Sequence, residues 1–94
     1  MERSLETLRE DINRIDENII ELLSRRMEVA KEIAILKKNR GIQVEDKERE
    51  SQVFLKIQRD ARKNLIDENF VLELFGLIIS HSKKIQNKLM EDQK

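Results

Sequence analysis

Apolar residues recur along the first third of the chain at alternating intervals of three and four. The positions are Leu5, Leu8, Ile12, Ile15, Ile19, Leu22, Val29, Ile33 and Leu36, and Arg26 stands where one further apolar residue is due. This is the a/d pattern of a coiled coil, sustained over more than four heptads. It predicts a helix from about Ser4, a suitable N-cap, to about Asn39, just before Gly41. We call its apolar a/d positions the seam.

A helix of this length cannot bury its seam against its own short chain. At 1.5 Å per residue it spans roughly 54 Å. A compact chain of about 100 residues is only roughly 34 Å across. We therefore expect an intertwined homodimer, in which a second copy of the chain covers the seam.

Two further helices are expected after a loop over residues 39–45. Asp46 is a suitable N-cap for the first, which ends near Asn64, and Asp67 for the second, which ends near Met90. The positions expected to face inward are Val53, Phe54, Ile57 and Ala61 in the first and Val71, Phe75, Ile78, Ser82, Ile85 and Leu89 in the second. The predicted fold is all-α, with one domain over residues 1–94 and three helices per chain in a dimeric bundle.

Composition supports this fold and excludes several kinds of chemistry. The 94 residues include no Pro and only two Gly, which is typical of long helices. There is no Cys and one His, so disulfides, thiol nucleophiles and multi-His metal sites are excluded. Basic and acidic residues balance at 19 each, and no apolar run approaches the roughly 20 residues of a membrane span. We expect a soluble, cytoplasmic protein that binds neither nucleic acid nor membrane.

Candidate chemistry lies where the apolar patterns are interrupted. A buried Arg26 would cost several kcal/mol without a compensating anion. It is therefore a register-setting or solvent-reaching residue, or it binds an anion inside the bundle. Lys37 follows eleven residues later, on nearly the same side of the helix and roughly 16 Å along it, so the two could hold a small dianion between them. Ser82 interrupts the last helix in the same way, with Gln86 one turn further on.

One group of polar residues and one separate arginine are further candidates. Asp46, Arg49 and Glu50 share the first turn of the second helix. They form either a capped, salt-bridged turn or one wall of a site. Arg9 lies about 26 Å from Arg26 along a straight helix and cannot join it within one chain. In an antiparallel dimer the partner's Arg9 could reach it, which would give two sites per dimer.

Three segments of the chain form a specific series. They are LREDINRIDENIIELLSRRMEVAKEIAILK (Leu8 to Lys37), DKERE (Asp46 to Glu50) and LFGLIISHSKKIQ (Leu74 to Gln86). Each motif alone is modest, but their order and spacing together are specific. They resemble, in turn, the long first helix, the loop-to-helix motif and the third helix of the small all-helical type of chorismate mutase, and the resemblance extends over nearly the whole chain.

The resemblance implies an enzyme that converts chorismate to prephenate, in phenylalanine and tyrosine biosynthesis, by a Claisen rearrangement without metal or cofactor. Arg26 and Arg9 of the partner subunit would each bind a carboxylate of chorismate. Lys37 would bind a carboxylate and the ether oxygen, with Gln86 on the other side of that oxygen. Such a site works by orienting the substrate and by stabilising the charge that develops on the ether oxygen.

The resemblance also assigns the remaining polar residues. Glu50 would accept a hydrogen bond from the ring hydroxyl, assisted by Asp46 or the Arg49 backbone, and Ser82 would contact a carboxylate. The chain departs from the family at Lys83, where relatives often have an apolar residue that closes the pocket.

Two alternatives stay open at this point. An isochorismate-pyruvate lyase resembles this family in its fold and its Arg/Lys clamp, although Glu50 suits the ring hydroxyl of chorismate better. A non-catalytic helical dimer would need an uninterrupted apolar seam, and Arg26 and Ser82 argue against it.

Overall fold

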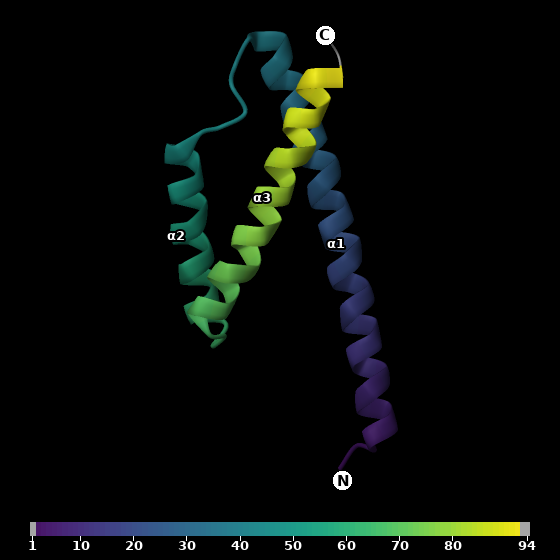
Figure 1. Cartoon of the computed structure of the whole chain (residues 1–94). Coiled ribbons are helices and arrows are strands. Elements are labelled where there is room, and N and C mark those ends of the chain that lie inside the picture. Colours follow the sequence, from purple (N-terminus) through teal and green to yellow (C-terminus); the bar gives the residue numbers. More distant parts are fainter. Residues whose placement is uncertain (1, 93–94) are drawn as a thin grey trace.

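The described part of the chain consists of three helices. The computed structural model describes residues 2–92, and these form α1 (Leu5–Arg40), α2 (Lys47–Lys63) and α3 (Glu68–Asp92) without any strand (Figure 1). This confirms the all-α fold and its long first helix. The largest difference from the expected bounds is at the end of α3, two residues beyond Met90. Met1, Gln93 and Lys94, which the predicted domain includes, lie outside the described residues.

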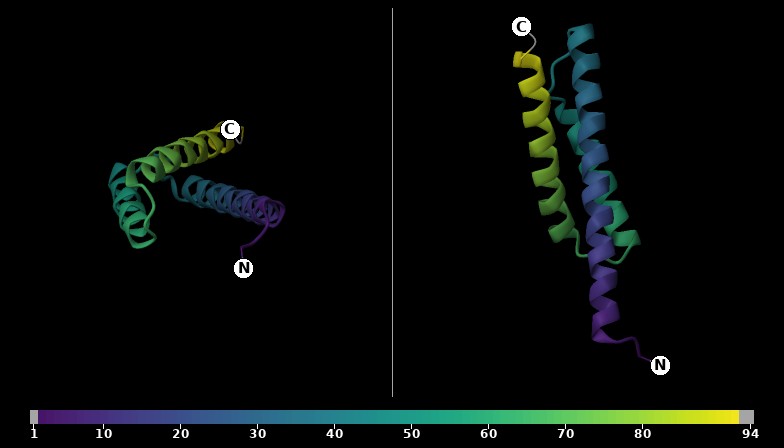
Figure 2. Two further views of the ribbon diagram at one scale, coloured as in Figure 1. Left: turned by 90° about the horizontal axis from the view of Figure 1, so that it is seen from below. Right: turned by 90° about the vertical axis from the view of Figure 1, so that its right-hand side faces the viewer.

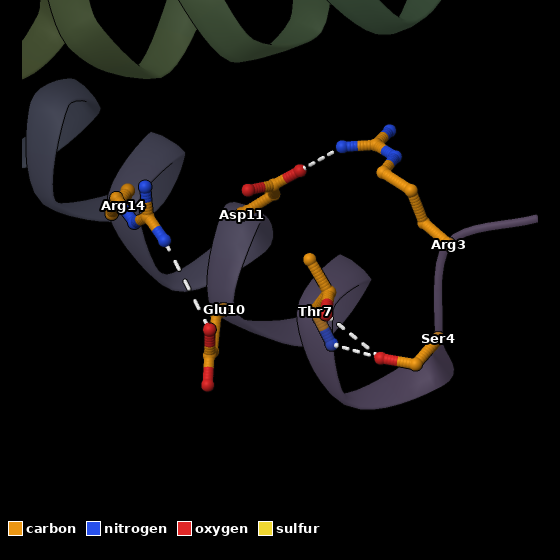
Figure 3. A network of polar contacts seen from close by, with 6 residues as sticks. All are labelled: Arg3, Ser4, Thr7, Glu10, Asp11 and Arg14. Carbon is orange, nitrogen blue, oxygen red and sulfur yellow. Dashed lines mark hydrogen bonds and ion pairs between the residues drawn. The ribbon is translucent and has the colours of Figure 1, made fainter.

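Each helix begins at the N-cap that the sequence predicts. The side chains of Ser4, Asp46 and Asp67 each accept a hydrogen bond from the backbone N–H three residues further on, at 3.1, 2.9 and 2.9 Å. Figure 3 shows this bond at the start of α1, where Arg3 also folds back to pair with Asp11. These caps satisfy backbone donors that have no partner within the helix and so fix where each helix starts.

The end of α1 depends on a glycine. Gly41 has a φ of 68°, in the left-handed region, and its N–H bonds to the Lys38 carbonyl at 3.2 Å. The next N–H, of Ile42, bonds to the Lys37 carbonyl at 2.8 Å. A side chain at position 41 would be strained at this φ, so glycine allows the chain to leave α1 and turn towards α2.

Within one chain, α3 packs against both other helices. Figure 1 shows α3 between α1 and α2, and over residues 2–92 the backbones of α1 and α2 do not come close to each other. Small residues allow the close approach, since Ala30 and Ala34 of α1 are 5% and 1% exposed. Ile57 and Ala61 of α2 are also buried, as the sequence predicts. Because α1 and α2 stay apart, a space remains between them, and α3 forms one of its walls.

The apolar residues of the α1 seam, unlike Ala30 and Ala34, are uncovered within the chain. All nine of these seam residues are exposed, from Leu8 at 39% to Leu5 at 62%. The molecule measures 60 × 25 × 15 Å with a radius of gyration of 17.1 Å, against about 13 Å for a compact chain of this length. Figure 2 shows the N-terminal end of α1 extending beyond the other helices. As expected, one chain does not bury this surface; the homodimer that would bury it stays a prediction.

No helix between residues 2 and 92 is both long enough and apolar enough to cross a bilayer.

Candidate active site

A cavity of about 420 Å³ lies between the C-terminal half of α1, the start of α2 and the C-terminal half of α3. We call it the pocket. Its polar lining residues are Arg26, Lys37, Asp46, Arg49, Glu50, Ser82, Lys83 and Gln86, and its apolar ones are Val29, Ala30, Ile33, Val44, Val53 and Ile79. Seven of the eight predicted site residues therefore come together from three separate helices. The eighth, Arg9, does not line it.

The two interruptions of the apolar patterns meet in the pocket. Arg26 of α1 donates a hydrogen bond from Nη1 to the Ser82 hydroxyl of α3 at 2.8 Å. The hydroxyl in turn donates to the sulfur of Met27 at 3.8 Å. Ser82 is 5% exposed and the Arg26 side chain is half-buried. One partner for a guanidinium leaves its other N–H donors free to bind an anion in the pocket.

Lys37 lies at the other end of the pocket and ties the loop between α1 and α2 to its wall. Its ammonium donates to the backbone carbonyl of Val44 at 2.9 Å. This bond holds the loop across the end of α1, and Val44 becomes part of the lining. An ammonium has three donors, so Lys37 can bind a ligand without releasing the loop.

The first turn of α2 supplies the acidic side of the pocket. Asp46 uses one carboxylate oxygen to cap the helix through the Arg49 N–H at 2.9 Å. Glu50, half-buried, pairs with Lys83 of α3 at 2.9 Å, and Lys83 lies 3.9 Å from Glu45. The hydrogen bond with Glu50 raises the pKa of Lys83 above its ordinary value, because it stabilises the protonated ammonium.

Gln86 is a buried amide with an unused polar atom. The residue is 9% exposed, and its carbonyl oxygen is buried without a hydrogen-bond partner among residues 2–92. A buried polar atom without a partner is rare in a folded protein and often marks a functional position. To bind an ether oxygen, as the resemblance implies, Gln86 must present its NH₂ group rather than this carbonyl.

The charges of the pocket suit a dianion. Arg26, Lys37, Arg49 and Lys83 bring four positive charges, and Asp46 and Glu50 bring two negative ones, which leaves a net charge of +2. The remaining walls are valine, isoleucine and alanine side chains, which lower the local dielectric and strengthen these interactions. No group of three or more His, Asp or Glu residues that could hold a metal ion occurs over residues 2–92.

Arg9 stays apart from this arrangement within one chain. It is exposed on α1 and lies outside the pocket, as expected from its distance along the helix. The structure also shows two contacts that the sequence did not predict. The Lys37–Val44 bond depends on the path of the loop, and the Lys83–Glu50 pair depends on how α2 and α3 pack. The only signal for the second was the departure from the family pattern at position 83.

Comparison with known proteins identifies the family to which the chain belongs. The family model described as chorismate mutase type II matches residues 8–87. The chain is 32% identical over 92 residues to the chorismate mutase of Methanocaldococcus jannaschii, which covers 98% of this chain and 93% of that relative. It is 36% identical over 84 residues to the bifunctional chorismate mutase/prephenate dehydratase of Buchnera aphidicola subsp. Schizaphis graminum, covering 89% of this chain and 22% of the relative.

A bifunctional chorismate mutase/prephenate dehydratase of Aquifex aeolicus is 28% identical over 88 residues, which are 90% of this chain and 24% of that relative. The chain thus spans about a quarter or less of these two bifunctional relatives and nearly all of the Methanocaldococcus protein. The chain belongs to the type II chorismate mutase family, and chorismate mutase activity is the function that this membership supports.

Proposed function

We propose that this chain converts chorismate to prephenate in the pocket, as a homodimer with two sites that each need a residue from both chains. The observation that carries the proposal is the pocket itself. Arg26 and Lys37 of α1 stand at its two ends, with Arg49 of α2 and Lys83 of α3 as further cations, between apolar walls and with a net charge of +2. Chorismate is a dicarboxylate, so its charge suits the pocket.

The residues of the pocket suit a reaction in which the enzyme orients the substrate and does not itself exchange protons or bonds with it. The Claisen rearrangement breaks the ether C–O bond and forms a C–C bond within one molecule, without proton transfer. Arg26 and Lys37 would hold the substrate carboxylates in the chair-like geometry in which the two carbons meet. Glu50 would accept a hydrogen bond from the ring hydroxyl, with Asp46 or the Arg49 backbone beside it. Ser82 would support the carboxylate at the Arg26 end.

The rate would come from charge stabilisation at the ether oxygen. Negative charge develops there as the C–O bond breaks. The Lys37 ammonium and the Gln86 NH₂ group would donate to that oxygen from two sides. Because apolar residues surround them, these interactions are stronger than they would be in water. They are also strongest in the transition state, which is the condition for catalysis.

The partner subunit would complete each site. The seam of α1 is uncovered along its length, and the partner's seam is its natural complement if the two helices run antiparallel. That arrangement would bring the N-terminal half of the partner's α1, with its Arg9, towards the C-terminal half of this chain's α1. Two equivalent sites would result.

The test is to incubate the purified protein with chorismate and, separately, with isochorismate, and to identify the products by chromatography. Prephenate formed from chorismate at an enzymatic rate is the expected result. Faster formation of salicylate and pyruvate from isochorismate would instead assign the lyase reaction. No product from either substrate would reject an enzymatic role for the pocket.

A further inference from the structure

Lys83 is the one charged residue of the pocket that the family resemblance does not account for. It sits on α3, directly after Ser82, and its ammonium lies 2.9 Å from a carboxylate oxygen of Glu50 on α2. Its other acidic neighbour, Glu45 in the loop, is more distant at 3.9 Å. The two side chains of the shorter pair are 34% and 26% exposed, so the pair lies at the margin of the pocket rather than on the open surface.

We propose that Lys83 is a positioning residue that holds Glu50 for its contact with the ring hydroxyl of chorismate. This inference rests on the function proposed above. Lys83 binds the Oε1 oxygen of Glu50, which fixes the plane of the carboxylate and leaves Oε2 to accept from the substrate. Without Lys83 the carboxylate could rotate towards the other cations of the pocket.

Stability alone is a poor explanation for this pair. Ion pairs that are about one-third exposed contribute little to stability, because water screens them. Positioning is a stricter demand, since a shift of about 1 Å in a group that orients the substrate can cost a large factor in kcat/KM. Lys83 also stays charged at neutral pH, because the ordinary pKa of a lysine already lies far above neutrality and the hydrogen bond to Glu50 raises it further. Its effect on Glu50 is therefore constant over the neutral range.

A direct role on the substrate carboxylates is the main competing explanation for Lys83. The two explanations differ in what they require of the substrate. A residue that acts through Glu50 matters only when the ring hydroxyl is present. A residue that attracts the carboxylates matters equally when that hydroxyl is replaced by hydrogen.

The experiment compares Lys83→Met with the unaltered protein on chorismate and on the analogue that lacks the ring hydroxyl. Met keeps an unbranched apolar side chain of similar length. With chorismate, we expect KM to rise about tenfold and kcat to change less than about twofold, because the hydroxyl contact is made in ground and transition states alike. With the analogue, the two proteins should differ by less than about twofold. Lys83→Arg should restore most of the loss.

Two further variants control the interpretation. Lys84→Met removes the same charge from an exposed position outside the pocket and should leave both constants unchanged. In a Glu50→Gln background, Lys83→Met should cause no further loss, because the group on which it acts has already changed.

Several outcomes would overturn the proposal. Equal losses on both substrates would mean that Lys83 binds the carboxylates directly. A fall in kcat with unchanged KM would indicate a smaller fraction of folded enzyme. A gain in rate would show that Lys83 competes with the substrate for Glu50, and no change would make it a surface ion pair. Absence of chorismate turnover in the unaltered protein would instead reject the proposed function itself.

Discussion

Arg26 interrupts the apolar pattern of α1 and Ser82 that of α3, and a single hydrogen bond links these two polar side chains inside the chain. Arg26 donates a hydrogen bond to Ser82 at 2.8 Å, and the Ser82 hydroxyl donates a weaker hydrogen bond to the sulfur of Met27. One donor of the guanidinium is thus satisfied inside the protein and the others face the pocket. A half-buried cation of this kind binds an anion at the expense of local stability.

Replacing Arg26 by Ala should therefore separate activity from stability. We expect kcat/KM to fall at least about a hundredfold, as for the loss of one donor to developing or bound charge. The free energy of unfolding should change by less than about 1 kcal/mol, because the lost hydrogen bond is offset by removal of a partly desolvated charge. Steady-state kinetics and urea unfolding at one protein concentration measure the two effects.

Arg59→Ala is the matched control, since Arg59 is an exposed arginine of α2 outside the pocket. It should leave activity and stability near those of the unaltered chain. If Arg26→Ala prevented folding, Arg26 would be a structural residue of the bundle, and the assignment to substrate binding would be wrong.

At the residue scale, some functional residues and contacts could be predicted from the sequence and others could not. Arg26 and Ser82 were found because each breaks a regular apolar pattern, which needs no knowledge of the packing. The contact between Lys83 and Glu50 could not be found this way, because it joins residues 33 positions apart through the angle between α2 and α3. The sequence marked Lys83 as unusual but carried no information about its partner.

At the scale of helices, capping residues decide where each element begins. Asp46 and Asp67 cap α2 and α3 with hydrogen bonds of the same length, 2.9 Å, but only Asp46 lines the pocket. Such signals are local, since a cap and the three residues after it are contiguous. For this reason the starts and ends of all three helices were predictable to within two residues.

The two aspartates provide a matched pair of variants. Asp46→Ala and Asp67→Ala should each lower the free energy of unfolding by about 1 kcal/mol, the usual cost of losing an N-cap. Only Asp46→Ala should also lower kcat/KM. Asp46→Asn keeps the cap and should have near-normal stability with reduced activity. Urea unfolding and chorismate turnover, both at fixed protein concentration, test these expectations, since the stability of a dimer depends on concentration.

Equal loss of activity in Asp46→Ala and Asp67→Ala, measured where both are folded, would contradict this argument. The activity of Asp46→Ala would then reflect a loosened helix rather than a missing pocket residue.

At the scale of the whole molecule, the chain is elongated and leaves a long apolar surface uncovered. Its longest dimension is 60 Å, and the apolar seam of α1 is exposed from end to end. The elongated shape was predictable, because the length of the heptad pattern exceeds the width of any compact fold of this size. The position of Arg9 relative to a second chain was not, because it depends on how the two copies pack.

Mixing two inactive variants tests whether the site is shared between chains. Arg9→Ala damages the contribution to the partner's site, and Lys37→Ala damages the chain's own site. In a hybrid dimer one site has the intact Lys37 of one chain and the intact Arg9 of the other, while the second site lacks both. Random exchange makes about half of the dimers hybrid, each with one of two sites intact, so about a quarter of normal activity should return.

A second mixture provides the control, because Arg26 and Lys37 belong to the same chain's site. Arg26→Ala mixed with Lys37→Ala should recover nothing, since each site of the hybrid still lacks one residue. Native mass spectrometry of chains with different mass tags shows whether exchange has occurred. If exchange is complete and the Arg9→Ala mixture stays inactive, each pocket draws no residue from its partner, and the proposed role of Arg9 is wrong. If activity returns when Arg9→Ala is mixed with Lys37→Ala but not when Arg26→Ala is mixed with Lys37→Ala, the protein must be a dimer in which α1 of each chain reaches the pocket of the other.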